Sequence, residues 1–167
     1  AQKVVVAYRD DGNSGYGTAV VGTVSGTSIS FGTPVVFESA GVYWITATYD
    51  ANAQKVVIAY RDTGNSNYGT AIVGTVSGTS ISFGSASVYE SASANDNSIA
   101  YDANAQKVVI AYYDAGNSNY GTAVVGTVSG TSISFGTPVV FESATTRDIG
   151  VAYDSNAQKT LITYQDD

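Results

Sequence analysis

The side chains best suited to binding chemistry lie where near-identical segments of this chain differ from one another. Tyr43 and Trp44 offer aromatic faces, while Arg9 and Arg61 offer planar guanidinium groups. Aromatic rings stack on the apolar faces of sugar rings, and guanidinium or amide groups form hydrogen bonds with hydroxyls. These residue types predict a shallow carbohydrate-binding surface, provided that the fold gathers them on one side.

The candidate residues come from two variable regions and one recurring loop. After a shared Glu-Ser-Ala the copies differ, at residues 41–44, 93–96 and 145–148, and a second variable position follows a recurring tyrosine. The predicted ligand-binding residues are Arg9, Tyr43, Trp44, Arg61, Asn65, Asn95, Asp96, Tyr113, Asn117, Arg147 and Asp148. Drift in unconstrained loops and contact with another protein subunit would produce the same variation, so both stay open as alternatives to ligand binding.

The sequence gives less support to a metal site or a catalytic site. The chain contains no Cys, Met or His, which excludes disulfides, thiolate chemistry and histidine-based zinc sites or acid–base catalysis. The loop at residues 62–67 offers oxygen ligands but lacks the residue order of a calcium loop. Asp10, Asp62 and Asp114 are instead predicted to accept hydrogen bonds from turn amides. Carboxylates recur symmetrically, whereas glycoside hydrolysis needs one pair in different surroundings. We therefore predict no catalytic residue, metal or cofactor.

Composition favours a folded, acidic protein. Apolar residues make up 44% of the 167 residues and charged residues only 13%, and the net charge is −7. A disordered tail has the opposite balance. Nucleic acid is excluded as a partner because no basic stripe is available to displace counterions from phosphates. No apolar run approaches the ~20 residues of a membrane-spanning helix, so no membrane insertion is expected.

The chain is a tandem repeat. Ala-Gln-Lys recurs every 52 residues, at 1–3, 53–55, 105–107 and 157–159, and the residues between are close to copies. A fixed period near fifty indicates one supersecondary unit stacked on itself. In the unit that begins near Tyr43, strands are predicted over residues 45–49, 54–61, 68–76 and 80–89, with no helix.

The second predicted strand is apolar on both faces. Val56, Ile58 and Tyr60 point to one side, and Val57 and Ala59 point to the other. A strand of this kind must be covered on both sides. Proline cannot donate to a strand ladder, so Pro34 and Pro138 place the fourth strand at a sheet edge.

These features predict an all-β fold built of β-propeller blades, each a four-stranded antiparallel meander. The predicted organisation is one repeat domain over residues 1–167. It comprises strands two to four of a blade (1–40), two whole blades (41–92 and 93–144) and strands one and two of a further blade (145–167). Residues 149–153, a first strand, could complete the N-terminal blade.

The number of blades is too small for a closed ring, because the ~10 Å spacing of packed sheets cannot be kept around three blades. Two outcomes stay open: several copies of the chain assemble into one ring of six or more blades, or further blades belong to a longer chain. In either case, alternate loops of a meander share one edge of the sheet. The variable segments and the Asp-X-Gly-Asn-Ser loops should therefore converge there, where binding residues commonly lie.

The chain resembles near-identical Gly-Asn-Ser-X-Tyr-Gly-Thr-Ala repeats of bacterial and phage surface or tail-fibre proteins. The motif stands at residues 12–19, 64–71 and 116–123, and the resemblance covers nearly the whole chain. It implies a surface-exposed repeat module, outside the cell or on a cell or virion surface. The period is similar to that of kelch propellers, and the hairpin at residues 49–56 faintly resembles an Asp-box, but neither signature is complete.

Two functions follow as hypotheses. The first is a non-enzymatic, multivalent, lectin-like module that recognises surface glycans through the variable face. The second is a structural or assembly module of an extracellular fibre, tail fibre or shell, in which the variable loops contact sister subunits. The expected partners are a carbohydrate or other cell-surface ligand and further copies or blades of the same kind.

Overall fold

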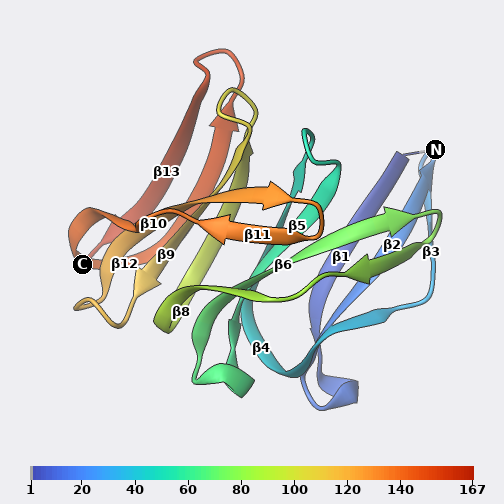
Figure 1. The fold of residues 1–167 in the computed structure, drawn as a ribbon, viewed down its shortest axis with the longest axis horizontal. Coiled ribbons are helices and arrows are strands. Elements are labelled where there is room, and N and C mark those ends of the chain that lie inside the picture. The colour runs from blue at the N-terminus through green and yellow to red at the C-terminus, as the bar shows by residue number, and fades with distance from the viewer. Residues whose placement is uncertain (1) are drawn as a thin grey trace.

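The computed structural model describes residues 2–167 and confirms an all-β protein: thirteen antiparallel strands form one sheet that does not close on itself (Figure 1). The strands are β1 (Gln2–Asp10), β2 (Tyr16–Ser25), β3 (Ser28–Phe31), β4 (Val35–Asp50), β5 (Lys55–Asp62), β6 (Tyr68–Ser77), β7 (Ser80–Phe83), β8 (Ser87–Asp102), β9 (Lys107–Asp114), β10 (Tyr120–Ser129), β11 (Ser132–Phe135), β12 (Val139–Asp154) and β13 (Lys159–Asp166). Short 3-10 turns, η1 (Asp11–Asn13) and η2 (Thr63–Asn65), follow β1 and β5.

Three long strands, β4, β8 and β12, divide the sheet into stacked layers. The first part of β4 pairs with β2 as far as Gly41, and from Val42 onward β4 pairs with β5. The same change of partner occurs in β8 and β12. We name the resulting segments layer 1 (residues 2–41), layer 2 (42–93), layer 3 (94–145) and layer 4 (146–166). Figure 1 shows them following one another across the molecule.

The variable segments are the bulged middles of these long strands, not the loops that the sequence predicted. The pairing register shifts between Tyr43 and Thr46 and at the equivalent points of β8 and β12. Trp44, Asp96 and Asp148, which are 52 residues apart, all have left-handed backbone conformations, with φ of 52°, 49° and 48°. A bulge with one left-handed residue bends a strand without ending it. The chain therefore passes from one layer to the next within a single long strand.

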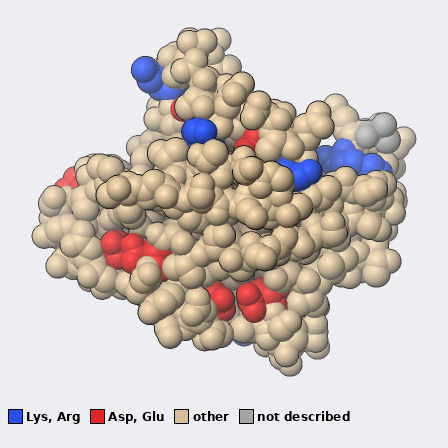
Figure 2. Space-filling view, viewed as in Figure 1, with Lys and Arg blue, Asp and Glu red and all other residues tan. Residues whose placement is uncertain are grey.

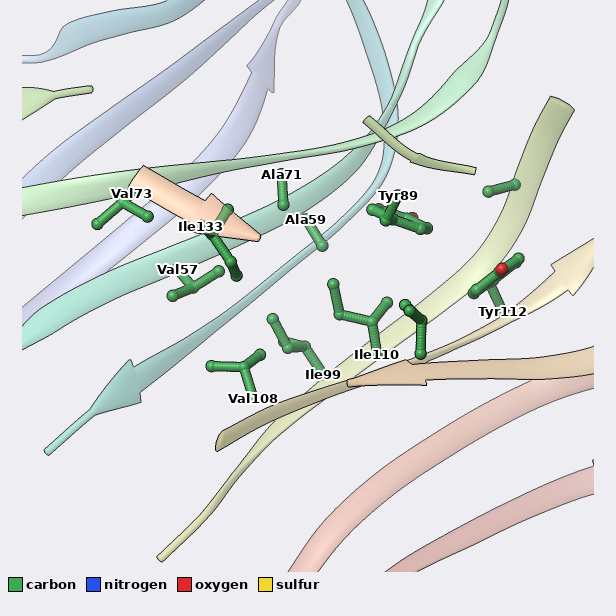
Figure 3. Close-up of a cluster of buried hydrophobic side chains, with 12 residues drawn as sticks. Val57, Ala59, Ala71, Val73, Tyr89, Ile99, Val108, Ile110, Tyr112 and Ile133 are labelled. Atoms are coloured by element: carbon green, nitrogen blue, oxygen red, sulfur yellow. The ribbon is translucent and has the colours of Figure 1, made fainter. Parts of the chain in front are cut away.

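The layers pack face to face through the second strand of each repeat. In β5, Val56, Ile58 and Tyr60 face layer 1, and Val57 and Ala59 face layer 3. The sequence predicted that this strand is covered on both faces, and the structure confirms it, because layers 1 and 3 pack on its two sides. Figure 3 shows the core between layers 2 and 3, where Val57, Ala59, Ala71 and Val73 lie opposite Ile99, Val108, Ile110 and Tyr112, with Ile133 among them.

A recurring hydrogen bond joins neighbouring layers within these cores. The hydroxyl of buried Tyr112 donates to the Glu90 carboxylate at 3.0 Å, and Tyr60 and Tyr164 do the same to Glu38 and Glu142, at 3.3 and 3.0 Å. Burial and the nearby Glu90 charge raise the pKa of Tyr112, so the phenol keeps its proton and acts as the donor.

Local turn chemistry explains where the strands end. Asp50 Oδ1 accepts hydrogen bonds from the backbone amides of Asn52 and Ala53, at 3.0 and 2.9 Å, and Asp102 and Asp154 repeat this arrangement. Such Asx turns hold the tight connection between the first and second strands. The hairpin after β6 turns at Gly78, whose φ of 60° suits glycine.

The two prolines lie in breaks between strands and not inside the predicted fourth strand. The short strands β3, β7 and β11 each pair with one neighbour only, so the predicted edge position itself agrees with the structure. Pro34 falls between β3 and β4, and Pro138 falls between β11 and β12. The predicted fourth strand at residues 80–89 is likewise divided into β7 and the start of β8. Because proline cannot donate to the ladder, it occupies the break where the chain leaves one short pairing and begins the next.

The layer stack is open at both ends within residues 2–167. The outer edge of β1 has no strand beside it, and residues 150–154 pair with β13 instead of completing the N-terminal layer. Figure 2 shows one face of the molecule, on which charged side chains are sparse. Lys and Arg are spread across the upper part of the view, and the larger groups of Asp and Glu lie in its lower part. Among the described residues there is no helix with the length and apolar character needed to cross a membrane.

The close packing of layers predicts that alanine substitution destabilises the protein at one of two equivalent glycines and has little effect at the other. A Cβ on Gly84 would lie 1.9 Å from the backbone oxygen of Thr131 in the next layer, whereas at Gly136 the nearest atom would be 3.8 Å away. Gly84→Ala should therefore lower the free energy of unfolding by about 1–3 kcal/mol. Gly136→Ala should change it by less than about 0.5 kcal/mol. Urea denaturation at protein concentrations at which the chain is monomeric measures both, and equal effects would contradict the packing of layer 2 on layer 3.

The interlayer glutamates predict a pH dependence. Burial, and then the nearby Asp114 charge, raise the pKa of Glu90, so the ionised form opposes folding and protonation relieves this cost. Glu90→Gln keeps an acceptor for Tyr112 and should stabilise the protein at about pH 7. The gain should shrink as the pH falls through the raised pKa of Glu90. Urea midpoints of both proteins across the acidic range test this, and a gain independent of pH would contradict it.

Candidate functional site

The two variable regions meet at one edge of the layers, which we name the bulge edge. It contains the bulges of β4, β8 and β12 and the turns that follow β1, β5 and β9. Thr63 Oγ1 donates to the Gly41 oxygen at 2.7 Å, and the Ala115 amide donates to the Ser93 oxygen at 3.1 Å. All eleven residues predicted from the sequence lie in the strands or turns of this edge.

Variable side chains from successive layers form a row along the bulge edge. Tyr43 lies between two guanidinium groups, with Arg9 Cζ 4.5 Å and Arg61 Cζ 4.8 Å from its ring centroid. Arg9 belongs to layer 1, and Tyr43 is paired with Arg61 across β4 and β5 in layer 2. A cation over an aromatic face is attracted by the negative face of the ring, so Tyr43 joins the two layers.

The row continues with different chemistry at the next junction. Arg61 Nη1 donates to Asn95 Oδ1 of layer 3 at 2.5 Å, and Asn95 is paired with Tyr113 across β8 and β9. Arg61 Nε is buried without a hydrogen-bond partner. Further along, Arg147 Nε donates to the Asp167 carboxylate at 2.6 Å. We name Arg9, Tyr43, Arg61, Asn95, Tyr113, Arg147 and Gln165 the variable row.

A hollow beside the row gathers most of the polar and aromatic candidates. Its volume is about 300 Å³. It is lined by Trp44, Asn95, Asp96, Tyr113, Arg147 and Asp148, which come from layers 2, 3 and 4. The Trp44 side chain is 48% exposed, and Asn97 Nδ2 donates to the Trp44 backbone oxygen at 3.2 Å. An open aromatic face therefore adjoins an amide, a guanidinium and two carboxylates.

The charges in the hollow influence one another. Partial burial, and then the Asp148 charge, raise the pKa of Asp96, while a backbone amide of Asp148 and the Arg147 charge act in the opposite direction. The two aspartates are thus close neighbours at equivalent positions of adjacent layers. Two acceptors beside one guanidinium can bind hydroxyl or ammonium donors of a ligand.

Backbone strain marks the same positions. Trp44, Asp96 and Asp148 are not glycines, yet each is left-handed, a conformation that costs about 1 kcal/mol or more for residues with a Cβ. The conformation bends each long strand where the chain crosses between layers. The side chains of these three residues also line the hollow.

Some predicted residues lie outside the hollow. Asn65 and Asn117 are exposed in the turns after β5 and β9, and Arg9 and Arg61 belong to the row but do not line the hollow. Asp62 and Asp114 accept hydrogen bonds from the Gly64 and Gly116 amides, at 2.8 and 2.9 Å, as the turn chemistry predicts. Asp10 makes no such bond. No group of three or more acidic side chains suited to a metal occurs among residues 2–167.

The residues predicted from the sequence did not include Asn97, Gln165 and Asp167. Gln165 is equivalent to Arg9, Arg61 and Tyr113, and Asp167 follows it in the second variable region. Their place in the repeat was therefore a usable signal. Asn97 carried no such signal, because its contact with Trp44 depends on how two layers stack.

Neither protein-family models nor curated proteins give a match to this chain.

Substitutions at Tyr43 test its role in joining the layers. Tyr43→Leu should lower the free energy of unfolding by about 1–2 kcal/mol, since each exposed cation–π contact contributes about 0.5–1 kcal/mol. Tyr43→Phe keeps the ring and should have little effect. Tyr43→Phe is therefore the matched control. Equal losses for Tyr43→Leu and Tyr43→Phe in urea denaturation would contradict the role.

Proposed function

We propose that this protein is a non-enzymatic, lectin-like module that binds carbohydrate through the hollow and the variable row. The observation that carries the proposal is the exposed Trp44 ring beside Asn95, Asp96 and Arg147 in one hollow. Sugar-binding sites need this combination, because a pyranose has apolar faces for stacking and hydroxyls for planar polar groups. The acidic groups recur at equivalent positions of adjacent layers, which favours binding over catalysis.

We further propose that each layer is a blade of a β-propeller. Layers 2 and 3 are four-stranded antiparallel meanders, and layer 2 is covered on both faces by its neighbours, which supports this. A propeller repeats one edge around its axis and would present several shallow sites together. One such site binds at roughly millimolar affinity, about −4 kcal/mol, and simultaneous binding at several sites gains a factor of about 10²–10⁴.

A second candidate function is a structural module of an extracellular fibre, tail fibre or shell. Two observations favour it. Members of the variable row contact one another between layers, as Arg61 and Asn95 do. Apolar side chains such as Phe31 and Leu161 are exposed on the outer faces of the stack, and exposed apolar patches mark association surfaces. Both functions place the protein outside the cell or on a cell or virion surface.

A glycan array followed by calorimetry separates the two functions. For a glycan found on the array, Trp44→Ala should weaken binding about two- to tenfold, since one stacking contact contributes about 0.5–1.5 kcal/mol. Trp44→Phe should keep part of the affinity. Asn117→Ala is the control and should bind like the parent protein, because Asn117 lies outside the hollow.

Stability has to be measured on the same variants. Trp44→Ala should leave the urea midpoint nearly unchanged, because half of the side chain is already exposed. Failure of every glycan to bind, together with stable higher oligomers in solution, would reject the lectin-like function in favour of the structural one.

A further inference from the structure

A second hollow, larger than the one at the bulge edge, lies beside the free edge of β1. It is an open groove of about 690 Å³. It is lined by Lys3, Val4 and Val5 of β1 and by Ala47, Thr48 and Tyr49 of β4. The groove therefore combines the unpaired backbone groups of an edge strand with side chains of the neighbouring layer, which is an arrangement that accepts an additional strand.

The repeat shows what occupies this position in the other layers. Layers 2, 3 and 4 each begin with a first strand that lies on the first strand of the neighbouring layer; for example, the Val151 amide donates to Ser98 Oγ at 2.9 Å. Layer 1 begins with its second strand, β1. Tyr49 is consequently 55% exposed, whereas the equivalent Tyr101 packs against the core between layers 2 and 3. The groove has the position of a first strand of layer 1.

We propose that the groove binds the first strand of layer 4, residues 150–154, from a second copy of this chain, and that β1 then takes the place of β13 beside that strand. The register follows from the pairing of β12 with β13: Asp154 would lie opposite Lys3, and Ala152 opposite Val5. The inference rests on the proposed stacking of blades in a ring, and it is independent of carbohydrate binding.

Side chains at the two chain ends support this exchange. In layers 2, 3 and 4, Asp154 and its equivalents lie opposite a lysine in the strand register. Lys3 lies in the edge strand β1, where no aspartate stands opposite it in the described residues, and its ammonium donates to the Thr23 hydroxyl at 2.6 Å. Tyr8 is equivalent to Tyr164, so it can donate to Glu142 of the second copy as Tyr164 does within the chain.

The aspartate that pairs with Arg147 is also duplicated. Asp167 holds Arg147 at 2.6 Å, and the equivalent residue of the first repeat is Asp11, while the two intervening copies have Thr63 and Ala115. Asp11 Oδ1 accepts from Arg9 Nε at 2.6 Å, as Asp167 Oδ1 accepts from Gln165 Nε2. The second oxygen of Asp11 is therefore the one that Arg147 would reach, as it reaches Asp167 Oδ2. β13 is the strand released, because it is exposed along most of its length whereas β1 is half buried.

The outer faces of the stack complement each other in the same arrangement. Ile29 of layer 1 is 47% exposed, while its equivalent Ile81 is 5% exposed beneath the preceding layer. On the opposite face, Val125 of layer 3 is 47% exposed, and its equivalent Val73 is fully buried. Reciprocal exchange between two copies covers both faces and gives six complete layers, within the range of about 4–8 blades for propellers.

Cysteine cross-linking tests the exchange directly, since the chain has no cysteine of its own. Lys3→Cys and Asp154→Cys in one chain should form two intermolecular disulfides on oxidation and give a band of dimer size on a non-reducing gel. Each single variant is the control and should give no closed dimer. A cross-linked band of monomer size would show that the strand comes from the same chain, and a ladder of larger species would show an open array; either result would overturn the proposal.

A second variant tests the closed ring without blocking the fold. In the ring, Thr27 of one copy would approach Gly136 of the other as Thr79 approaches Gly32, where a Cβ would lie 2.1 Å from the Thr79 oxygen. Light scattering should therefore find a dimer for the parent chain and a folded monomer for Gly136→Ala. A parent chain that is monomeric at every concentration would reject exchange between copies and leave the groove to a flanking repeat of a longer chain. A glycan bound by that monomer would keep the lectin-like function intact.

Discussion

The apolar faces of the second strand of each repeat must both be covered, and the rest of the structure follows from this constraint. Successive side chains of a strand point to opposite faces, so Ile58 and Val57 enter two different cores, one on each side of layer 2. The Tyr–Glu hydrogen bond fixes the relative position of the layers within those cores. A layer of this kind cannot be stable alone, because each face needs a neighbour of the same shape. The two end faces of the stack are consequently the surfaces most prone to association, since they carry the exposed Ile29 and Val125 side chains.

Crossing from layer to layer inside a continuous strand determines where variation is possible. The chain has to leave one sheet and enter the next between Gly41 and Thr46, and a bulge with a left-handed residue performs this turn. Val42 and its equivalent Ala94 enter the cores between layers, whereas the Tyr43 and Trp44 side chains are exposed. The exposed positions are therefore the ones whose identity is free to differ between copies. They are nevertheless fixed in space, because strands on either side are paired. The hollow thus combines variable side chains with a rigid support, which is a favourable basis for recognition.

Much of the fold could be predicted from the sequence, because the repeat displays its own period and alternation. The all-β class, the antiparallel strands and the absence of α-helix within residues 2–167 agree with the alternating pattern of Val56 to Tyr60. The bulged strands were not predictable in the same way, since a left-handed Trp44 has no sequence signature. Pro34 does limit strand pairing, but it lies in a break between strands and not in an edge strand. Nine of the eleven candidate residues were found by their variation, and Asn65 and Asn117 by the recurring loop. The division of the nine between the row and the hollow depends on how the layers stack.

Differences between the copies also have a consequence for the order of the layers. Near-identical repeats offer many nearly equivalent ways to stack, and a slipped arrangement would preserve the common core contacts. The contacts of the variable row differ at each junction: Arg9 and Arg61 enclose Tyr43 at the first, and Arg61 binds Asn95 at the second. If layers 2 and 3 were exchanged, Asn95 would lie beside Arg9 in place of Tyr43. Arg9 would then lose its cation–π contact with the Tyr43 ring. Each mismatch removes about 0.5–1 kcal/mol, so the same variable residues that surround the hollow also favour one order of stacking over the others.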